Sequence, residues 1–156
     1  MDGRLKNDFM KKIAIAVLAC WTLIQVQAGE LKWLTDLPAA QAQAKAENKM
    51  VLLDFTGSDW CGWCIKFKGE ALDTTEFKDY AAKNLVLVEV DFPRKKPQSD
   101  EVKKANEALS KKFKADGFPT FVVLNKDGAE IGRQDGYEKG GAKAFIALLE
   151  KSKKKN

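Results

Sequence analysis

Residues 51–64 read VLLDFTGSDWCGWC. The apolar run from Met50 to Phe55 predicts a buried strand, and Thr56-Gly57-Ser58 predicts the turn that ends it. If a helix begins near Cys61, the sulfur of this residue lies over the unpaired N–H groups of the first helical turn, which favours the thiolate over the thiol. Cys64 follows one turn later, close enough to form a disulfide with Cys61. The stretch therefore predicts thiol–disulfide chemistry.

Three segments resemble the thioredoxin superfamily and follow one another in the order found in that family. Residues 54–55 (Asp-Phe) and 60–64 (Trp-Cys-Gly-Trp-Cys) are similar to its active-site strand and helix start. Residues 117–120, Gly-Phe-Pro-Thr, precede an apolar strand, and residues 125–128, Asn-Lys-Asp-Gly, resemble a hairpin turn. The resemblance implies a thioredoxin-like α/β fold, with a mixed central sheet and helices on both faces. It also implies that a cis peptide bond precedes Pro119 and that this proline lies against the cysteine pair.

The sequence also departs from that family. The dipeptide between the cysteines is Gly-Trp, whereas thioredoxins have Gly-Pro and protein disulfide isomerases have Gly-His. One more residue separates Asp54 from Cys61 than in thioredoxin itself, and residues 92–117 are longer and richer in lysine. The resemblance therefore predicts the fold but not the subtype.

Four residues are candidates for the catalytic chemistry: Cys61, Cys64, Asp54 and Pro119. Thiol–disulfide exchange needs an exposed thiolate that attacks and a second thiol that resolves the mixed disulfide. We expect Cys61 to attack, because it comes first at the helix start, and Cys64 to resolve, because the helix carries it inward. The family resemblance implies that Asp54 moves a proton to and from Cys64.

Asp54 has two interpretations. It lies mid-strand among apolar residues, where an ionised carboxylate is costly, so its pKa is expected to be raised. The alternative is an ordinary exposed aspartate near the strand end. The extra residue before Cys61 supports the alternative, because it can move the acid out of reach of the cysteines.

The substrate is expected to bind around the cysteine pair. Pro119 has no N–H group, so the neighbouring backbone is free to pair with a substrate strand, and the two tryptophans of the CGWC stretch can form an apolar rim. For Trp63, simple packing is the alternative. The candidate substrate-binding residues are Trp60, Gly62, Trp63, Phe118 and Thr120.

The composition restricts the class of protein. The 156 residues predict one domain, and 27 basic against 22 acidic residues predict a mixed-charge surface rather than a face for nucleic acid. The absence of histidine excludes histidine-based triads and histidine metal sites. Three cysteines cannot form a four-cysteine zinc site. No metal or other cofactor is expected.

Residues 1–28 are interpreted as a secretory signal peptide, and residues 29–156 as the thioredoxin-like domain. Lys11-Lys12 precedes an apolar run over residues 13–24, too short for the ~20 residues that span a bilayer. Residues 26–28, Val-Gln-Ala, offer a small-residue cleavage site. Met10 would be a better start for this signal than the first residue.

Two alternatives concern this N-terminal segment. It can form a buried helix of the domain, or Cys20 can be the acylated cysteine of a lipoprotein. The apolar run continues beyond Cys20, which disfavours lipidation. We therefore expect a periplasmic or secreted protein rather than a lipid-anchored one.

The remaining elements follow from periodicity and capping signals. The loop at residues 92–97 is either a solvated linker or a docking patch for an acidic partner. The last two strands are expected to pair antiparallel, because four residues are too few for a parallel crossover. The expected elements are an edge strand at 31–34, a helix from the Asp36 cap to 48, strand 50–55, a helix from 61 loosened at Gly69, a helix at 76–83 capped by Thr74 or Thr75, strand 85–91, helix 100–114, strands 121–124 and 129–134, helix 139–151, and a frayed basic tail at 152–156.

The functional hypothesis is thiol–disulfide exchange on protein substrates of a bacterial cell envelope, with a redox partner that recycles the cysteine pair and with the protein as a monomer. The direction is open. The uncharged Gly-Trp dipeptide adds no stabilisation to the thiolate, which favours a reductase. The alternatives are a dedicated electron carrier for one envelope partner and a non-catalytic binding module that uses the thioredoxin groove.

Overall fold

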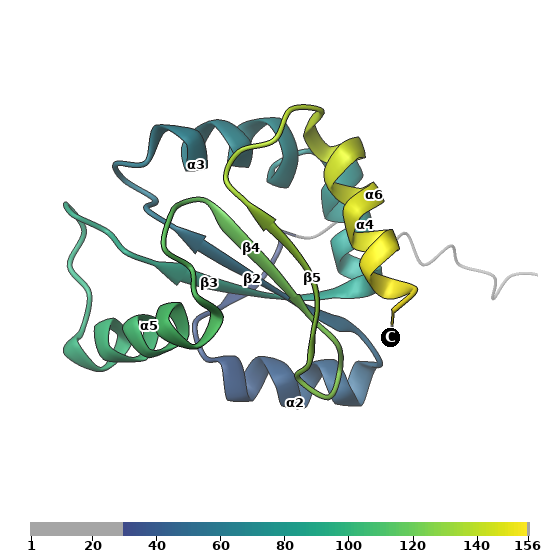
Figure 1. Ribbon diagram of the computed structural model, residues 1–156, viewed down its shortest axis with the longest axis horizontal. Coiled ribbons are helices and arrows are strands. Elements are labelled where there is room, and N and C mark those ends of the chain that lie inside the picture. Colours follow the sequence, from purple (N-terminus) through teal and green to yellow (C-terminus); the bar gives the residue numbers. More distant parts are fainter. Residues whose placement is uncertain (1–29, 156) are drawn as a thin grey trace, which may run out of the picture.

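A five-stranded mixed sheet forms the centre of the protein (Figure 1). The computed structural model describes residues 30–155. The strand order is β1-β3-β2-β4-β5, and the first three strands in this order are parallel to one another. Strand β4 runs antiparallel to β2, and β5 runs antiparallel to β4, which confirms the predicted hairpin. The strands are β1 (Trp33–Leu34), β2 (Met50–Thr56), β3 (Leu85–Asp91), β4 (Thr120–Leu124) and β5 (Glu130–Asp135).

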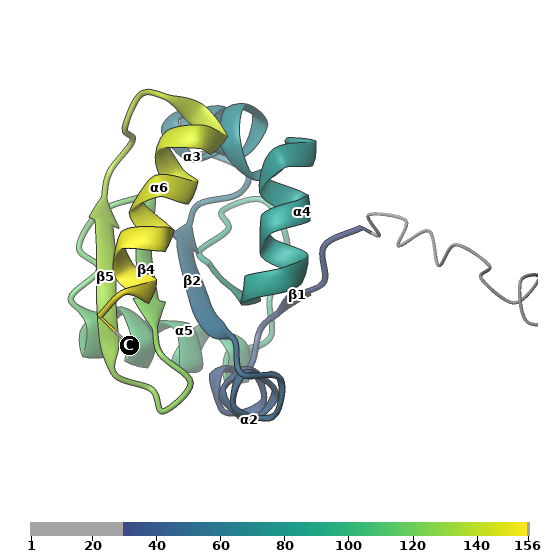
Figure 2. The same ribbon diagram turned by 90° about the vertical axis from the view of Figure 1, so that its right-hand side faces the viewer.

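Helices cover both faces of this sheet, which confirms the predicted fold class. Helices α2 and α5 lie against one face, and α3, α4 and α6 lie against the other, as the two views show (Figures 1 and 2). The helices are α2 (Leu37–Glu47), α3 (Gly62–Phe67), the π-helical turn η1 (Lys68–Leu72), α4 (Thr75–Asn84), α5 (Asp100–Phe113) and α6 (Gly141–Lys153).

The alternation of side chains along β2 divides the core into two layers. Leu52 packs with Phe67 of α3 and Phe145 of α6, whereas Leu53 packs in the layer that contains Phe113 of α5. Successive side chains of a strand point to opposite faces. Asp54, two residues after Leu52, therefore points to the face that the cysteine-bearing helix covers.

The predicted helix starts are confirmed by their capping hydrogen bonds. The Asp36 carboxylate accepts from the Ala39 N–H at 2.6 Å at the start of α2. The Ser99 hydroxyl oxygen accepts from the N–H of Val102 at 3.3 Å at the start of α5. At α4 the cap is Thr74 rather than Thr75. Such caps satisfy N–H groups that have no partner inside the helix.

The loosening predicted at Gly69 is confirmed, because α3 gives way there to the π-helical turn η1. The two ends of α6 differ from the sequence predictions. Helix α6 starts at Gly141 rather than 139, after Gly140 in the left-handed region (φ 114°). The prediction of a frayed tail from residue 152 was wrong at its start: α6 runs to Lys153, and Ser152 is buried because its side chain packs against Gly132.

The interpretations of the N-terminus lie outside the described residues. They are the signal peptide at residues 1–28, the start at Met10 and the acylation of Cys20. Within residues 30–155, no helix has both the length and the apolar character needed to cross a membrane.

Candidate active site

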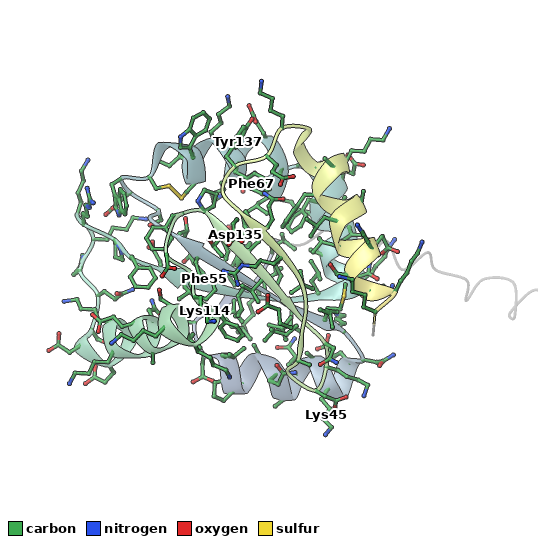
Figure 3. The ribbon with its side chains drawn as sticks, in the orientation of Figure 1. Lys45, Phe55, Phe67, Lys114, Asp135 and Tyr137 are labelled. Atoms are coloured by element: carbon green, nitrogen blue, oxygen red, sulfur yellow. A yellow bond between two sulfur atoms is a disulfide. The ribbon has the colours of Figure 1, made fainter. Side chains whose placement is uncertain are left out.

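The two cysteines of the CGWC stretch form a disulfide at the start of α3 (Figure 3). Cys61 is the N-cap residue, with extended backbone (φ −81°, ψ 102°), and its N–H donates to the carbonyl of Gly57 at 2.8 Å. One turn later the N–H of Cys64 donates to Cys61 Sγ at 3.2 Å, and the two Cα atoms are 5.3 Å apart. A hydrogen bond of this kind favours the charged form of the sulfur. The geometry is that of a redox pair.

Burial alone does not distinguish the attacking cysteine from the resolving one. In the disulfide, Cys61 is 7% exposed and Cys64 is 6% exposed. Their positions differ: Cys61 lies at the helix N-cap beside the turn, whereas Cys64 lines a pocket on the inner side of the helix. The assignment of Cys61 as nucleophile therefore rests on its place in the helix.

The structure brings Pro119 to the same end of the sheet as the cysteines. The Phe118–Pro119 peptide bond is cis. Thr120 pairs with Phe55 near the end of β2, where the cysteine-bearing loop leaves the sheet. The ring of Phe118 meets that of Trp60 edge-on, with centroids 6.0 Å apart. The second sequence match thus adjoins the first in space.

Asp54 is buried beside the inner cysteine. It is 7% exposed, and its Oδ1 has no hydrogen-bond partner within residues 30–155. A pocket of about 370 Å³ borders both Asp54 and Cys64. Burial, and then the negative charges of Glu89 and Asp91, raise the pKa of Asp54 to about 8. The alternative of an exposed strand-end aspartate is excluded by this burial.

Glu89 is a second acid at this pocket, and the sequence predictions did not include it. It is the register partner of Asp54 on the neighbouring parallel strand, and it also lines the pocket. Burial, followed by the charge of Asp91, raises the pKa of Glu89. The only sequence signal was that Glu89 interrupts an otherwise apolar strand, and the register of β2 with β3 was needed to place it.

Trp63 forms an exposed aromatic surface next to the disulfide. Its side chain is 57% exposed and packs on one side against Tyr137, with ring centroids 4.9 Å apart. Tyr137, which lies near Phe67 (Figure 3), donates its hydroxyl to Glu70 Oε2 at 2.6 Å. No sequence signal pointed to Tyr137, because it follows β5 and meets α3 only through the tertiary fold.

The side chains of Trp60 and Thr120, predicted to bind substrate, each donate a hydrogen bond to a backbone carbonyl of the protein itself. Trp60 is half-buried, and its Nε1–H donates to the carbonyl of Phe92 at 2.7 Å. The Thr120 hydroxyl is buried and donates to the carbonyl of Gly117 at 2.8 Å. Gly62 is exposed, with open space where a side chain would be. A role of these three residues in substrate binding stays a prediction.

The position of Trp60 predicts a specific effect at Gly57. A Cβ atom there would lie 2.5 Å from Trp60 Cε2, so the indole must shift and lose its bond to Phe92. Gly57→Ala is expected to destabilise the fold by about 1–3 kcal/mol, measured by urea unfolding. Gly62→Ala is the control, because it meets no atom within 4 Å and lies in a helix. An equal effect of both substitutions would contradict the prediction.

The fold and the disulfide site define the class of the protein as a thiol–disulfide oxidoreductase of the thioredoxin superfamily. The chain belongs to the thioredoxin-like domain family, whose model matches residues 37–153.

One curated relative and two solved structures illustrate the similarity. The disulfide bond reductase DsbH of Chlamydia pneumoniae is 37% identical over 129 residues, which cover 83% of this chain and 76% of that protein. A solved structure of a DsbH oxidoreductase superposes with a TM-score of 0.76 at 36% identity, over 86% of this chain and 94% of the other. The reduced C-terminal domain of Neisseria meningitidis DsbD superposes with a TM-score of 0.56 at 27% identity, over 74% and 93% of the two chains.

Proposed function

We propose that this protein reduces disulfides in other proteins of a bacterial cell envelope. The observation that carries the proposal is the Cys61–Cys64 disulfide at a helix start, with the buried acid Asp54 beside the inner cysteine. The similarity to a relative named as a disulfide bond reductase supports the reducing direction.

The reaction begins from the dithiol form of the protein. The Cys61 thiolate attacks one sulfur of the substrate disulfide, forms a mixed disulfide and releases the other substrate sulfur as a thiolate, which takes up a proton. The thiol of Cys64 gives its proton to the Asp54 carboxylate and attacks Cys61 Sγ. The second substrate sulfur leaves as a thiolate and takes up the proton held by Asp54, and the protein is left with its own disulfide. A redox partner must then return two electrons and two protons, as this stoichiometry requires.

The surface around the pair suggests how a substrate is held. Within residues 30–155, the backbone N–H and C=O groups of Phe118 form no hydrogen bond, whereas the carbonyl of Pro119 accepts from the Gly136 N–H. An extended substrate segment can therefore pair with Phe118 while its side chains contact the exposed Trp63. In this arrangement Pro119 contributes shape rather than a donor, because it has no N–H.

A dedicated electron carrier is the second candidate within the same chemistry. Its support is the same Cys61–Cys64 pair, because passing electrons to one partner disulfide needs no other group. A non-catalytic binding module has less support, because binding alone does not need two cysteines in disulfide geometry. The carrier and the general reductase differ in the range of disulfides that they reduce.

Reduction of insulin by dithiothreitol tests the proposed function. We expect the wild-type protein to accelerate precipitation of the insulin B chain, and the variant Cys61→Ser/Cys64→Ser to leave the uncatalysed rate unchanged. A wild-type protein without activity on insulin but with rapid exchange with one envelope partner would favour the electron carrier. Inactivity on both would contradict the proposed function.

The envelope location gives a separate prediction. If residues 1–28 are a signal peptide, export leaves Gly29 as the first residue, and the mature protein has two cysteines. Mass spectrometry of the protein purified from the envelope should show this N-terminus. A diacylglyceryl group on Cys20 would contradict the prediction and place the protein on a membrane.

A further inference from the structure

The lysine-rich loop after β3 is bonded to the active-site loop by a single carboxylate. Asp59, two residues before Cys61, accepts hydrogen bonds from three consecutive backbone N–H groups: those of Arg94 at 2.9 Å, Lys95 at 2.7 Å and Lys96 at 3.0 Å. These bonds lower the pKa of Asp59, so the carboxylate stays charged. The backbone of residues 94–96 is thereby fixed beside the cysteine pair.

Further contacts join the same two loops. The Asp91 carboxylate accepts from the N–H of Ser58 at 2.8 Å and from its hydroxyl at 2.5 Å. The Lys96 ammonium donates to Ser58 Oγ at 3.2 Å, and the carbonyl of Phe92 accepts from Trp60. A solvated linker does not need such anchoring. These hydrogen bonds instead fasten the loop to the active-site loop.

The anchoring leaves the charged groups of Arg94 and Lys95 available for another molecule, whereas the Lys96 ammonium is bonded to Ser58. All three residues are exposed, and none forms an ion pair within residues 30–155. Of the nearby carboxylates, Asp59 and Asp91 accept bonds from backbone N–H groups and from Ser58 instead, and Glu89 lines a pocket together with Lys96 without forming an ion pair with it. The Arg94 guanidinium lies 3.7 Å from the centre of the Trp60 ring, so at least one of the cations is held directly beside the cysteine stretch.

We infer that residues 94–96 form a basic rim that docks an acidic segment of the substrate protein next to its disulfide. The inference rests on the proposed function and adds a substrate class to it. A polypeptide whose disulfide reaches Cys61 comes close to this rim, because Arg94 stacks on Trp60, the residue before Cys61. Its acidic side chains would then meet cations whose backbone is fixed by hydrogen bonds. Such charge complementarity acts mainly on the rate of association and on the choice of partner.

Two synthetic peptides test this inference. Each contains the same disulfide, flanked by glutamates in one peptide and by lysines in the other. The protein is first reduced with dithiothreitol, freed of it, and mixed in excess with each peptide, so that its own dithiol supplies both electrons. At about 20 mM salt we expect the acidic peptide to be reduced about tenfold faster, and at about 1 M salt the ratio should approach one, because salt screens exposed charges.

Charge-reversal variants connect the preference to the rim. Arg94→Glu/Lys95→Glu should reverse the preference between the peptides, while Lys96 is left intact because it contacts Ser58. The matched control, Lys45→Glu/Lys151→Glu, makes the same change in net charge at sites away from the cysteines, with Lys45 at the far end of the molecule (Figure 3), and should keep the wild-type ratio.

The outcomes separate the two proposals. Equal rates for both peptides at low salt, or the same loss of preference in both double variants, would overturn the basic rim and leave the proposed function standing. Failure to reduce either peptide would overturn the proposed function and the inference with it.

Discussion

Cys64→Ser is expected to convert the protein from a catalyst into a trap. The Cys61 thiolate still attacks a substrate disulfide, but no second thiol is present to resolve the mixed disulfide. The variant should therefore accumulate covalent complexes with substrate proteins and lose turnover on insulin almost completely. Non-reducing electrophoresis of envelope extracts, followed by dithiothreitol release and mass spectrometry, measures the complexes and identifies the trapped proteins.

Cys61→Ser is the matched control for this experiment. It keeps one cysteine, but that cysteine lies on the inner side of α3 at the pocket of Asp54. We expect few complexes from it. If Cys61→Ser traps substrates and Cys64→Ser does not, the roles assigned to the two cysteines are reversed.

Asp54→Asn is expected to change the pH dependence of stability. The folded pKa of about 8 lies far above the value near 4 of an unfolded aspartate, so the folded state holds a proton that the unfolded state releases. The contribution of Asp54 to stability is therefore most favourable below about pH 4 and falls as the pH rises to about 8, at up to about 1.4 kcal/mol per pH unit. Urea unfolding of the oxidised variant should lack most of this slope, and the variant should be more stable than wild type at neutral pH.

The same substitution is expected to slow the resolution of the mixed disulfide. Asparagine cannot accept the proton of Cys64, so the second step should slow by about tenfold to a hundredfold near and above neutral pH, while attack by Cys61 stays nearly unchanged. Stopped-flow kinetics with a peptide disulfide separates the two steps. Equal rates and an unchanged stability slope in Asp54→Asn would contradict a proton-transfer role for this buried acid.

Glu89→Gln provides the companion measurement. The charge of Glu89 raises the pKa of Asp54, so its removal should shift the pH midpoint of the resolution step downward without abolishing the step. Asp91 and Lys68 also act on Asp54, the first raising and the second lowering its pKa, and both remain in this variant. A midpoint that does not move would show that the two acids titrate independently.

The resemblance of three segments to the thioredoxin superfamily was sufficient for the fold class, and a local pattern was sufficient for the redox pair. The spacing of Cys61 and Cys64 is one helical turn, and such a spacing places two sulfurs together whatever the rest of the fold does. The alternation along β2 and the caps at Asp36 and Ser99 are equally local, because they depend on residues a few positions apart. The end of α6 was misjudged, because burial of Ser152 against Gly132 is a contact between distant segments.

The chemical surroundings of the disulfide were decided by the tertiary structure. The parallel register between β2 and β3 buries Asp54 and places Glu89 beside it. No local pattern in the sequence specifies this register. Tyr137 contacts Trp63, which lies 74 positions earlier in the chain (137 − 63). Asp59 binds the backbone of residues 94–96, which lie about 35 positions later (94 − 59). By itself the sequence determined a thioredoxin-like chain with a redox pair. The burial of Asp54, the aromatic surface at Trp63 and the anchoring of residues 94–96 required the folded structure, because each depends on residues that only the packing of distant elements brings together.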